Sequence, residues 1–301
     1  MSDYGIEPPN YRLPSETHLG RVRLQVSDLT RSQAYYERVL GLRVLEHGSG
    51  FALLGPHGED RVLVELRELR GAHPVPRRGR IGLYHFAILL PDRPSLGRFL
   101  AHLEELGAYA GMSDHFVSEA IYLTDPDGLG IEVYADRPRS EWKNQDRQLV
   151  MTTVPLDVES VLEAAKESAE GTPWRGMPRG TVIGHVHLHV ADLESAAAFY
   201  HAGLGLDKTV WNYPGALFLA AGGYHHHLGT NTWAAGVPPA GPEDARLLEW
   251  EIVVPTASDA ADAARSLTSG SATVHSDGTD WLAADPWGTV VRIRAEDGAT
   301  P

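Results

Sequence analysis

The amino-acid sequence predicts an α+β protein made of four βαβββ modules. The first observation is an internal repeat: residues 19–44 read LGRVRLQVSDLTRSQAYYERVLGLRV, and residues 183–207 read IGHVHLHVADLESAAAFYHAGLGLD. The second is a late turn and strand that also occurs twice, DPDGLGIEVYAD at 125–136 and DPWGTVVRIRAED at 285–297. Repeated supersecondary units of this kind indicate a duplicated architecture.

Both copies of the repeat give the same order of elements. An alternating strand comes first, and an Asp that can cap a helix follows, Asp28 in one copy and Asp192 in the other. The next stretch has helical periodicity with a Tyr on its inner face, and it stops at Gly41 or Gly205. Further strands are expected at 51–54, 61–66, 216–221 and 225–230.

Two more modules of the same order complete the prediction. One runs from residue 83 to 134 with a helix at 95–106, and the other runs from 247 to 293 with a helix at 257–267. Each ends in one of the two late strands quoted above. Four modules therefore account for nearly the whole chain.

A domain boundary is expected between the second and third modules. The stretch 137–147 is rich in Pro and Arg, a short helix follows near 157–168, and a Gly/Pro stretch extends to residue 180. Such segments are typical of linkers. We therefore expect three parts: an N-terminal domain at 15–140, a linker with a short helix at 141–180 and a C-terminal domain at 181–296.

Composition excludes two classes of partner. The chain has 26 basic and 40 acidic residues, a formal net charge of -14, which would repel nucleic acids and anionic lipid surfaces. No apolar run approaches the roughly 20 residues that span a bilayer. Residues 1–14 also lack a basic region followed by an apolar core. We expect a cytoplasmic protein with no nucleic-acid or membrane partner.

The residue types also limit the chemistry. The sequence contains no Cys, so a metal site would have to use His, Asp, Glu or backbone oxygens. Fifteen histidines supply candidates for such a site.

The four modules, with their first-strand and fourth-strand features, resemble the vicinal oxygen chelate superfamily of glyoxalases, bleomycin-resistance proteins and extradiol dioxygenases. The resemblance covers about residues 15–295 and is closest to bacterial catechol 2,3-dioxygenase-like ring-cleaving enzymes. It implies that modules pair into two half-barrels, with metal ligands at the start of strand one and on strand four. In this chain those positions hold His85, His185 and Glu132, whereas modules one and four hold Arg21 and Arg292.

This ligand set makes two predictions. Two His and one carboxylate form the facial triad of non-haem Fe(II) oxygenases, so Fe(II) is the expected metal, and Mn(II) also suits these ligands. Because His85 and Glu132 belong to module two and His185 to module three, these modules should pair with each other. Modules one and four should then form a metal-free half. His187 and His189 are interpreted as supporting or structural residues.

Two further segments resemble the catalytic segments of the extradiol dioxygenases. Residues 113–136 place His115 and Tyr122 near the substrate, ahead of the Glu ligand. Residues 222–231, GGYHHHLGTN, resemble the strand with the acid/base His; His226 matches best, and His225 and His227 stay open. The resemblance implies a small aromatic diol and O2 as substrates, His226 as the proton carrier, and a ring-opened semialdehyde as product.

Other functions stay open from the sequence. A glyoxalase-type metal-dependent isomerase or lyase has the same fold but usually needs a second carboxylate, and a thiol transferase is a further alternative. A non-catalytic protein that binds a small aromatic ligand could use Trp211, Trp233, Tyr224 and Phe218. The identity of the diol is open, and a homo-oligomer is only a general expectation.

Overall fold

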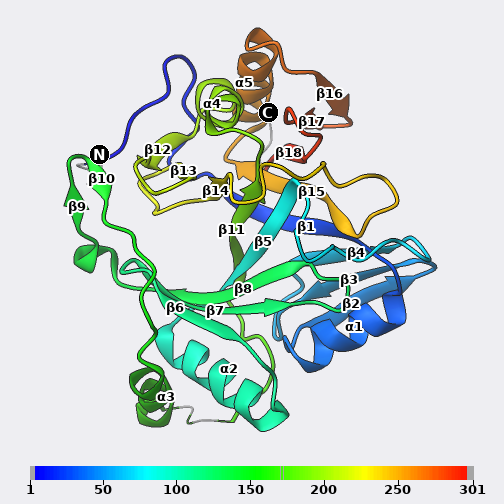
Figure 1. Ribbon diagram of the computed structural model, residues 1–301, viewed down its shortest axis with the longest axis vertical. Coiled ribbons are helices and arrows are strands. Elements are labelled where there is room, and N and C mark those ends of the chain that lie inside the picture. Colours follow the sequence, from blue (N-terminus) through cyan, green and yellow to red (C-terminus); the bar gives the residue numbers. More distant parts are fainter. Residues whose placement is uncertain (1–3, 170, 172, 297–301) are drawn as a thin grey trace.

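The computed structural model describes residues 4–169, 171 and 173–296 and contains four βαβββ modules (Figure 1). The first comprises β1 (His18–Val26), α1 (Leu29–Arg38), β2 (Arg43–Gly48), β3 (Phe51–Gly55) and β4 (Val64–Glu68). The second comprises β5 (Gly82–Leu89), α2 (Arg93–Leu106), β6 (Gly111–Asp114), β7 (Ser118–Thr124) and β8 (Gly130–Asp136).

The other two modules repeat this order. The third comprises β11 (Val182–His189), α4 (Leu193–Ala196) with the π-helical continuation η2 (Ala197–Gly203), β12 (Asp207–Val210), β13 (Ala216–Ala220) and β14 (Leu228–Asn231). The fourth comprises β15 (Arg246–Val254), α5 (Ala257–Ser269), β16 (Val274–Asp277), β17 (Asp280–Ala284) and β18 (Val290–Ala295). The predicted α+β class and four-module organisation are confirmed.

The modules pair across the two halves of the sequence. One eight-stranded sheet has the order β12-β13-β14-β11-β5-β8-β7-β6 and joins modules three and two. The other has the order β16-β17-β18-β15-β1-β4-β3-β2 and joins modules four and one. The central pairs, β11 with β5 and β1 with β15, are antiparallel and lie side by side in Figure 1. The predicted pairing of module two with module three is therefore confirmed.

The core lies on the face of each sheet opposite the polar residues of the first strands. Val22, Phe86, Val186 and Trp250 occupy equivalent places in the four modules, and all are fully buried in one hydrophobic cluster. Because successive strand residues point to opposite faces, the residue before each of them points away from this core. Those preceding positions include His85 and His185, the proposed metal ligands.

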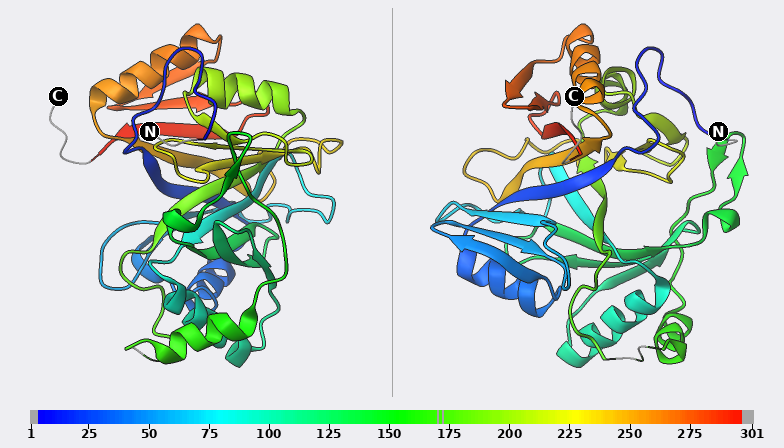
Figure 2. Two further views of the ribbon diagram at one scale, coloured as in Figure 1. Left: turned by 90° about the vertical axis from the view of Figure 1, so that its left-hand side faces the viewer. Right: turned by 180° about the vertical axis from the view of Figure 1, so that it is seen from behind.

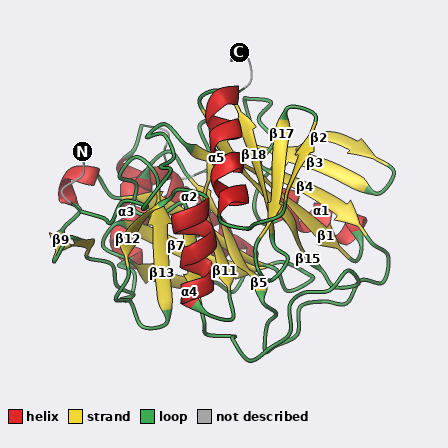
Figure 3. Ribbon diagram, turned by 90° about the horizontal axis from the view of Figure 1, so that it is seen from above, coloured by secondary structure: helices red, strands yellow, loops and turns green. Residues whose placement is uncertain are grey.

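The helices begin and end where the sequence predicts. Asp28 accepts a hydrogen bond from the backbone of Arg31 and caps α1, and Asp192 accepts one from Ser195 and caps α4. Gly41 follows α1 with φ +76°, a conformation that a side chain would disfavour. Figure 3 shows α4 and α5 lying over strands of the two sheets. None of the helices in the described residues has the length and apolar character needed to cross a bilayer.

The segment between modules two and three is partly folded. It contains the short helix η1 (Arg139–Glu141), the hairpin of β9 (Asn144–Gln145) and β10 (Gln148–Leu149), and α3 (Val158–Glu167). The predicted short helix is thus present as α3, capped by Asp157. Helix α3 packs beside α2, while the β9–β10 hairpin lies at another edge of the molecule (Figure 2).

Candidate metal centre and active site

Three buried side chains from three adjacent strands meet on the β11–β5–β8 part of the sheet. Oε2 of Glu132 on β8 lies 2.9 Å from Nε2 of His85 on β5 and 3.1 Å from Nε2 of His185 on β11. Each of the three residues is at most 5% exposed. Within the described part of the chain, these residues form the only group of three or more His or acidic side chains close enough to share an ion.

The distances between these atoms fit a shared metal ion. Two ligand atoms that are each about 2.1 Å from an ion, at right angles to each other, lie roughly 3 Å apart. The 2.9 Å contact of His85 with Glu132 also lacks the alignment of a hydrogen bond. A buried polar atom without such a bond is costly, and a metal ion between the side chains would satisfy it.

The charge state of the group also suits a metal. Burial lowers the pKa of His185 to about 4, against the opposing effect of Glu132. Burial alone would raise the pKa of Glu132, but the neighbouring His185 and His85 hold it well below its usual range. At neutral pH the carboxylate is therefore ionised and the His185 imidazole is neutral, which is the protonation state that a ligand needs.

A cavity of about 410 Å³ opens beside this group, and His85 and Glu132 form part of its wall. His185 lies behind them and is only 1% exposed. Cavities of this size accept small organic ligands. Of the four aromatic residues that the binding-protein alternative named, Phe218 and the half-exposed Trp233 line this cavity, whereas Trp211 and Tyr224 do not.

His115 and Tyr122 lie together on the same cavity wall. Nε2 of His115 is 2.6 Å from the Tyr122 hydroxyl, and Nδ1 of His115 is 2.6 Å from the carbonyl oxygen of Thr152. Because a carbonyl can only accept, Nδ1 of His115 donates to Thr152, and a His115 ring with a single proton would accept at Nε2 from the Tyr122 hydroxyl. Tyr122 pairs with Glu132 between β7 and β8. Burial, and then the charge of Glu132, raise the pKa of Tyr122 well above its usual value.

Of the three consecutive histidines, His226 alone lines the cavity. Its ring lies 4.1 Å from that of His185, measured between centroids, whereas His225 and His227 face other groups. The prediction that the triplet lies on a strand is wrong, because β14 begins only at Leu228. Gly222 and Gly223 both have positive φ and form a turn that delays the strand.

Several cavity residues were not predicted from the sequence. Met151, Thr152 and Thr153 come from the segment interpreted as a linker, and Tyr84 and Tyr213 come from a strand and a loop. Nothing in the linker composition indicates a cavity wall, because the contact depends on how the chain crosses the sheet. His187 also lines the cavity, and its Nε2 is 3.0 Å from Nδ2 of Asn231.

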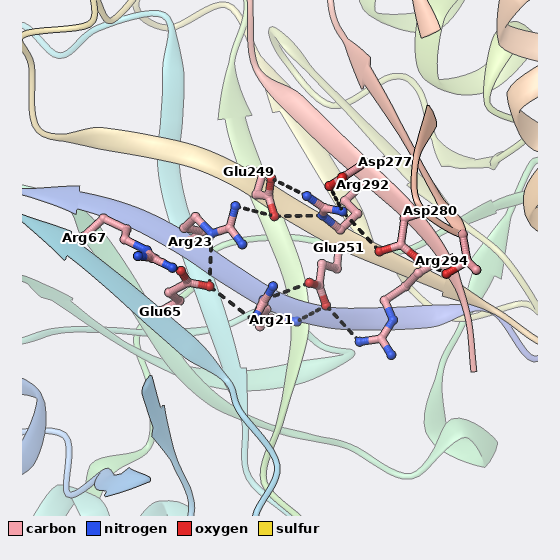
Figure 4. Close-up of polar contacts among 11 residues, drawn as sticks. Arg21, Arg23, Glu65, Arg67, Glu249, Glu251, Asp277, Asp280, Arg292 and Arg294 are labelled. Atoms are coloured by element: carbon pink, nitrogen blue, oxygen red, sulfur yellow. Dashed lines mark hydrogen bonds and ion pairs between the residues drawn. The ribbon is translucent and has the colours of Figure 1, made fainter. Parts of the chain in front are cut away.

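The other half-barrel carries ion pairs at the positions equivalent to the metal ligands (Figure 4). Arg21 lies 2.8 Å from Glu251 and 3.2 Å from Glu65, and Arg292 lies 2.9 Å from Glu249. Each carboxylate already faces at least one guanidinium, so opposite charges are matched without an ion. In modules one and four, ion pairs thus stand at the positions where module two and module three hold His85, Glu132 and His185.

Comparisons with known proteins place this architecture in a family. The sequence model of the glyoxalase/bleomycin resistance protein/dioxygenase superfamily matches residues 18–133. A Bacillus subtilis (strain 168) protein named catechol-2,3-dioxygenase is 48% identical over 242 residues, which cover 79% of this chain and 83% of that protein.

Solved structures support the fold. A Bacillus subtilis strain 168 crystal structure superimposes with a TM-score of 0.65 and 14% identity, covering 96% of this chain and 87% of the other. Glyoxalase I from Zea mays gives a TM-score of 0.55 and 18% identity, with 92% of each chain covered. The 48% identity over most of both chains, with the match to the sequence model, shows that the chain belongs to the glyoxalase/bleomycin resistance protein/dioxygenase superfamily, also called the vicinal oxygen chelate superfamily.

Proposed function

We propose that this protein is a metal-dependent extradiol dioxygenase that cleaves the ring of a catechol-type substrate with O2. One observation carries the proposal: a two-His, one-carboxylate group, an acid/base His and a His–Tyr pair all lie at one cavity. The 48% identity to a protein named catechol-2,3-dioxygenase supports the same assignment.

His85, His185 and Glu132 would hold the metal, with Fe(II) preferred and Mn(II) also suited to the ligands. The bound ion would supply positive charge that favours the deprotonated diol and allows oxygen to react beside it. In the overall reaction the ring bond next to the diol breaks and both atoms of O2 enter the product. One ring carbon becomes a carboxylic acid and the other an aldehyde, so no external reductant is needed.

His226 would carry the proton that a diol hydroxyl loses on binding. Its Nδ1 is 2.7 Å from Nδ1 of His225, which leaves Nε2 for the substrate. Burial, and then the neighbouring His185, lower the pKa of His226 well below its usual value. The imidazole is therefore neutral at pH 7 and can accept a proton there.

His115 and Tyr122 would orient the substrate oxygens. The Tyr122 hydroxyl oxygen, 2.6 Å from Nε2 of His115, can accept a hydrogen bond from a substrate hydroxyl. Phe218 and Trp233 would pack against the ring.

The isomerase alternative has less support from the geometry. Its second carboxylate would come from the fourth strand of module three, where the position equivalent to Glu132 is Gly229. A Cβ at Gly229 would lie 2.9 Å from the ring of His187, so there is no room for a longer side chain. The described residues therefore offer one carboxylate to the metal rather than two.

The proposal is tested by loading the protein with Fe(II) without oxygen, removing unbound metal, and adding a panel of substituted catechols and then O2. We expect the yellow absorbance of a ring-opened semialdehyde with the wild type and none with Glu132→Ala. Stoichiometric metal without colour across the panel would overturn the proposal and favour the isomerase.

A further inference from the structure

Behind the cavity, three side chains form a continuous line of hydrogen bonds. Oδ1 of Asp136, the last residue of β8, lies 2.9 Å from Nε2 of His225. Nδ1 of His225 lies 2.7 Å from Nδ1 of His226. The two histidines are 0% and 6% exposed, so water competes little for these contacts.

With an ionised carboxylate and two neutral rings, the hydrogen-bonding capacities of these groups determine the position of every proton in the line. An ionised carboxylate can only accept, so His225 must donate from Nε2 to Asp136. A neutral imidazole has one donor and one acceptor nitrogen, so Nδ1 of His225 accepts. The hydrogen bond between the two rings then requires that His226 donates from Nδ1, which leaves its Nε2 without a proton.

The groups around Asp136 favour its role as an acceptor. The Tyr224 hydroxyl donates to the same Oδ1 atom at 3.2 Å, and the Tyr134 hydroxyl lies 2.7 Å from that of Tyr224. Two donors on one oxygen fit an ionised carboxylate. The ring of Tyr224 packs on His225 with centroids 4.1 Å apart, and Trp142 contacts His225 from another side. His225 is therefore held in one orientation.

We infer that Asp136 and His225 are positioning residues that fix the tautomer of His226 so that an unprotonated Nε2 is presented to the substrate. This inference rests on the proposed function for its use, but the arrangement itself does not require ring cleavage. A histidine in the other tautomer would present an N–H to the substrate and could not take its proton. Asp136 and His225 thus determine which nitrogen of His226 carries the proton, and they do so without contacting the substrate.

A spectroscopic experiment tests the tautomer directly. The full chain is labelled with nitrogen-15, loaded with diamagnetic Zn(II), and the imidazole signals of His226 are assigned by their loss in His226→Ala. We expect a protonated Nδ1 and a bare Nε2 in the wild type. We expect His225→Phe, which keeps a ring but has no nitrogen, to give a mixture of tautomers or the opposite one. A proton on Nε2 in the wild type, or identical signals in His225→Phe, would overturn the inference.

A kinetic experiment on the Fe(II)-loaded protein separates positioning from substrate binding. We expect Asp136→Ala and His225→Phe to lower kcat by roughly 10- to 100-fold with little change in KM, because general acid/base catalysis is worth about 10² to 10⁴ in total. Tyr224→Phe is the matched comparison: it removes the longer of the two hydrogen bonds to Asp136 and keeps the ring that packs on His225, so its fall in kcat should be smaller than that of either variant in the line.

The two experiments distinguish the failure of this inference from that of the proposed function. The predicted tautomer in a protein that cleaves no catechol would leave the inference standing and overturn the dioxygenase proposal. Ring cleavage with an unchanged kcat in both Asp136→Ala and His225→Phe would overturn the inference alone.

Discussion

Glu132 and His185 are 53 positions apart in the chain, yet Oε2 of Glu132 lies 3.1 Å from Nε2 of His185. The contact exists because β5 of module two pairs with β11 of module three. Strand β8 pairs with the other edge of β5, so only one strand separates β8 from β11. Modules one and two are therefore divided between the two sheets, as are modules three and four, and the candidate site belongs to both halves of the chain.

Glu132→Ala should lose most of the bound metal while the fold is retained. The carboxylate is the one anionic side chain of the group, so its loss removes the main attraction for a divalent ion. Metal content after gel filtration, measured by elemental mass spectrometry, checks this. Arg292→Leu, at the equivalent place in the other half-barrel, is the control and should keep its metal. Equal loss in both variants would show that the site is not at Glu132.

Arg292→Leu should instead lower the free energy of unfolding by about 2 kcal/mol, because it removes charged hydrogen bonds to Glu249 and leaves that buried carboxylate with less compensation. Urea unfolding compared with the wild type measures the change. An unchanged midpoint and slope would mean that these ion pairs contribute no net stability.

His226→Ala should keep its metal and lose turnover by roughly 10² to 10⁴, the usual worth of general acid/base catalysis. Its side chain lines the cavity, and it does not belong to the ligand group. Steady-state kinetics and metal analysis on the same sample check both parts. Loss of the metal from this variant would make His226 a ligand instead of a proton carrier.

Tyr122→Phe should reduce kcat by roughly tenfold to a hundredfold, since one positioned hydrogen-bonding group is removed. The ring and its packing are retained, so metal content and unfolding midpoint should match the wild type. Thr153→Val is the control, because Thr153 lines the cavity and contacts His115 only at 3.4 Å. A larger effect for Thr153→Val than for Tyr122→Phe would contradict the assigned role.

The folded protein should lose stability as the pH falls below about 6.5. Burial lowers the pKa of His227 from 6.5 to about 3, so the unfolded chain binds its proton first. Stability from this residue is full above pH 6.5 and is lost as the pH falls toward 3. Burial lowers the pKa of His185 to about 4, which acts in the same direction. Urea unfolding at pH 7, 6 and 5 checks the trend.

His227→Gln gives the matched comparison for this pH dependence. Its unfolding free energy should fall less between pH 7 and pH 5 than that of the wild type, because a titrating group is gone. Nδ1 of His227 accepts from the backbone of Ala221, so the variant should also be less stable at pH 7. An equal fall with pH in both proteins would assign the effect to other groups.

Much of this fold could be predicted from the sequence because its signals are local. Each of these signals depends on only a few neighbouring residues. Examples are the helix caps Asp28 and Asp192, the helix stop at Gly41 and the alternation along the strands. The module pairing was predicted for a different reason: only His85 with Glu132 and His185 complete a ligand set, and that set forces modules two and three together.

The rest depended on contacts that are far apart in the sequence. The wall formed by Met151 to Thr153 needs the intervening segment to return across the sheet, which composition does not encode. The alternation of residue types predicts a strand over the three consecutive histidines at 225–227. It does not reveal the turn made by Gly222 and Gly223, which delays the start of the strand. The hydrogen bonds from His226 through His225 to Asp136 likewise join distant parts of the sequence. Asp136 lies 89 positions before His225 and 90 positions before His226.

The most direct test of the central claim is the fate of the oxygen atoms. The Fe(II)-loaded protein is supplied with an accepted catechol and ¹⁸O₂, and the product is reduced at once so that its aldehyde oxygen cannot exchange with water. We predict one heavy oxygen in the new carboxylate and one in the alcohol derived from the aldehyde. A product without heavy oxygen, or conversion that proceeds equally well without O2, would contradict ring cleavage by this site.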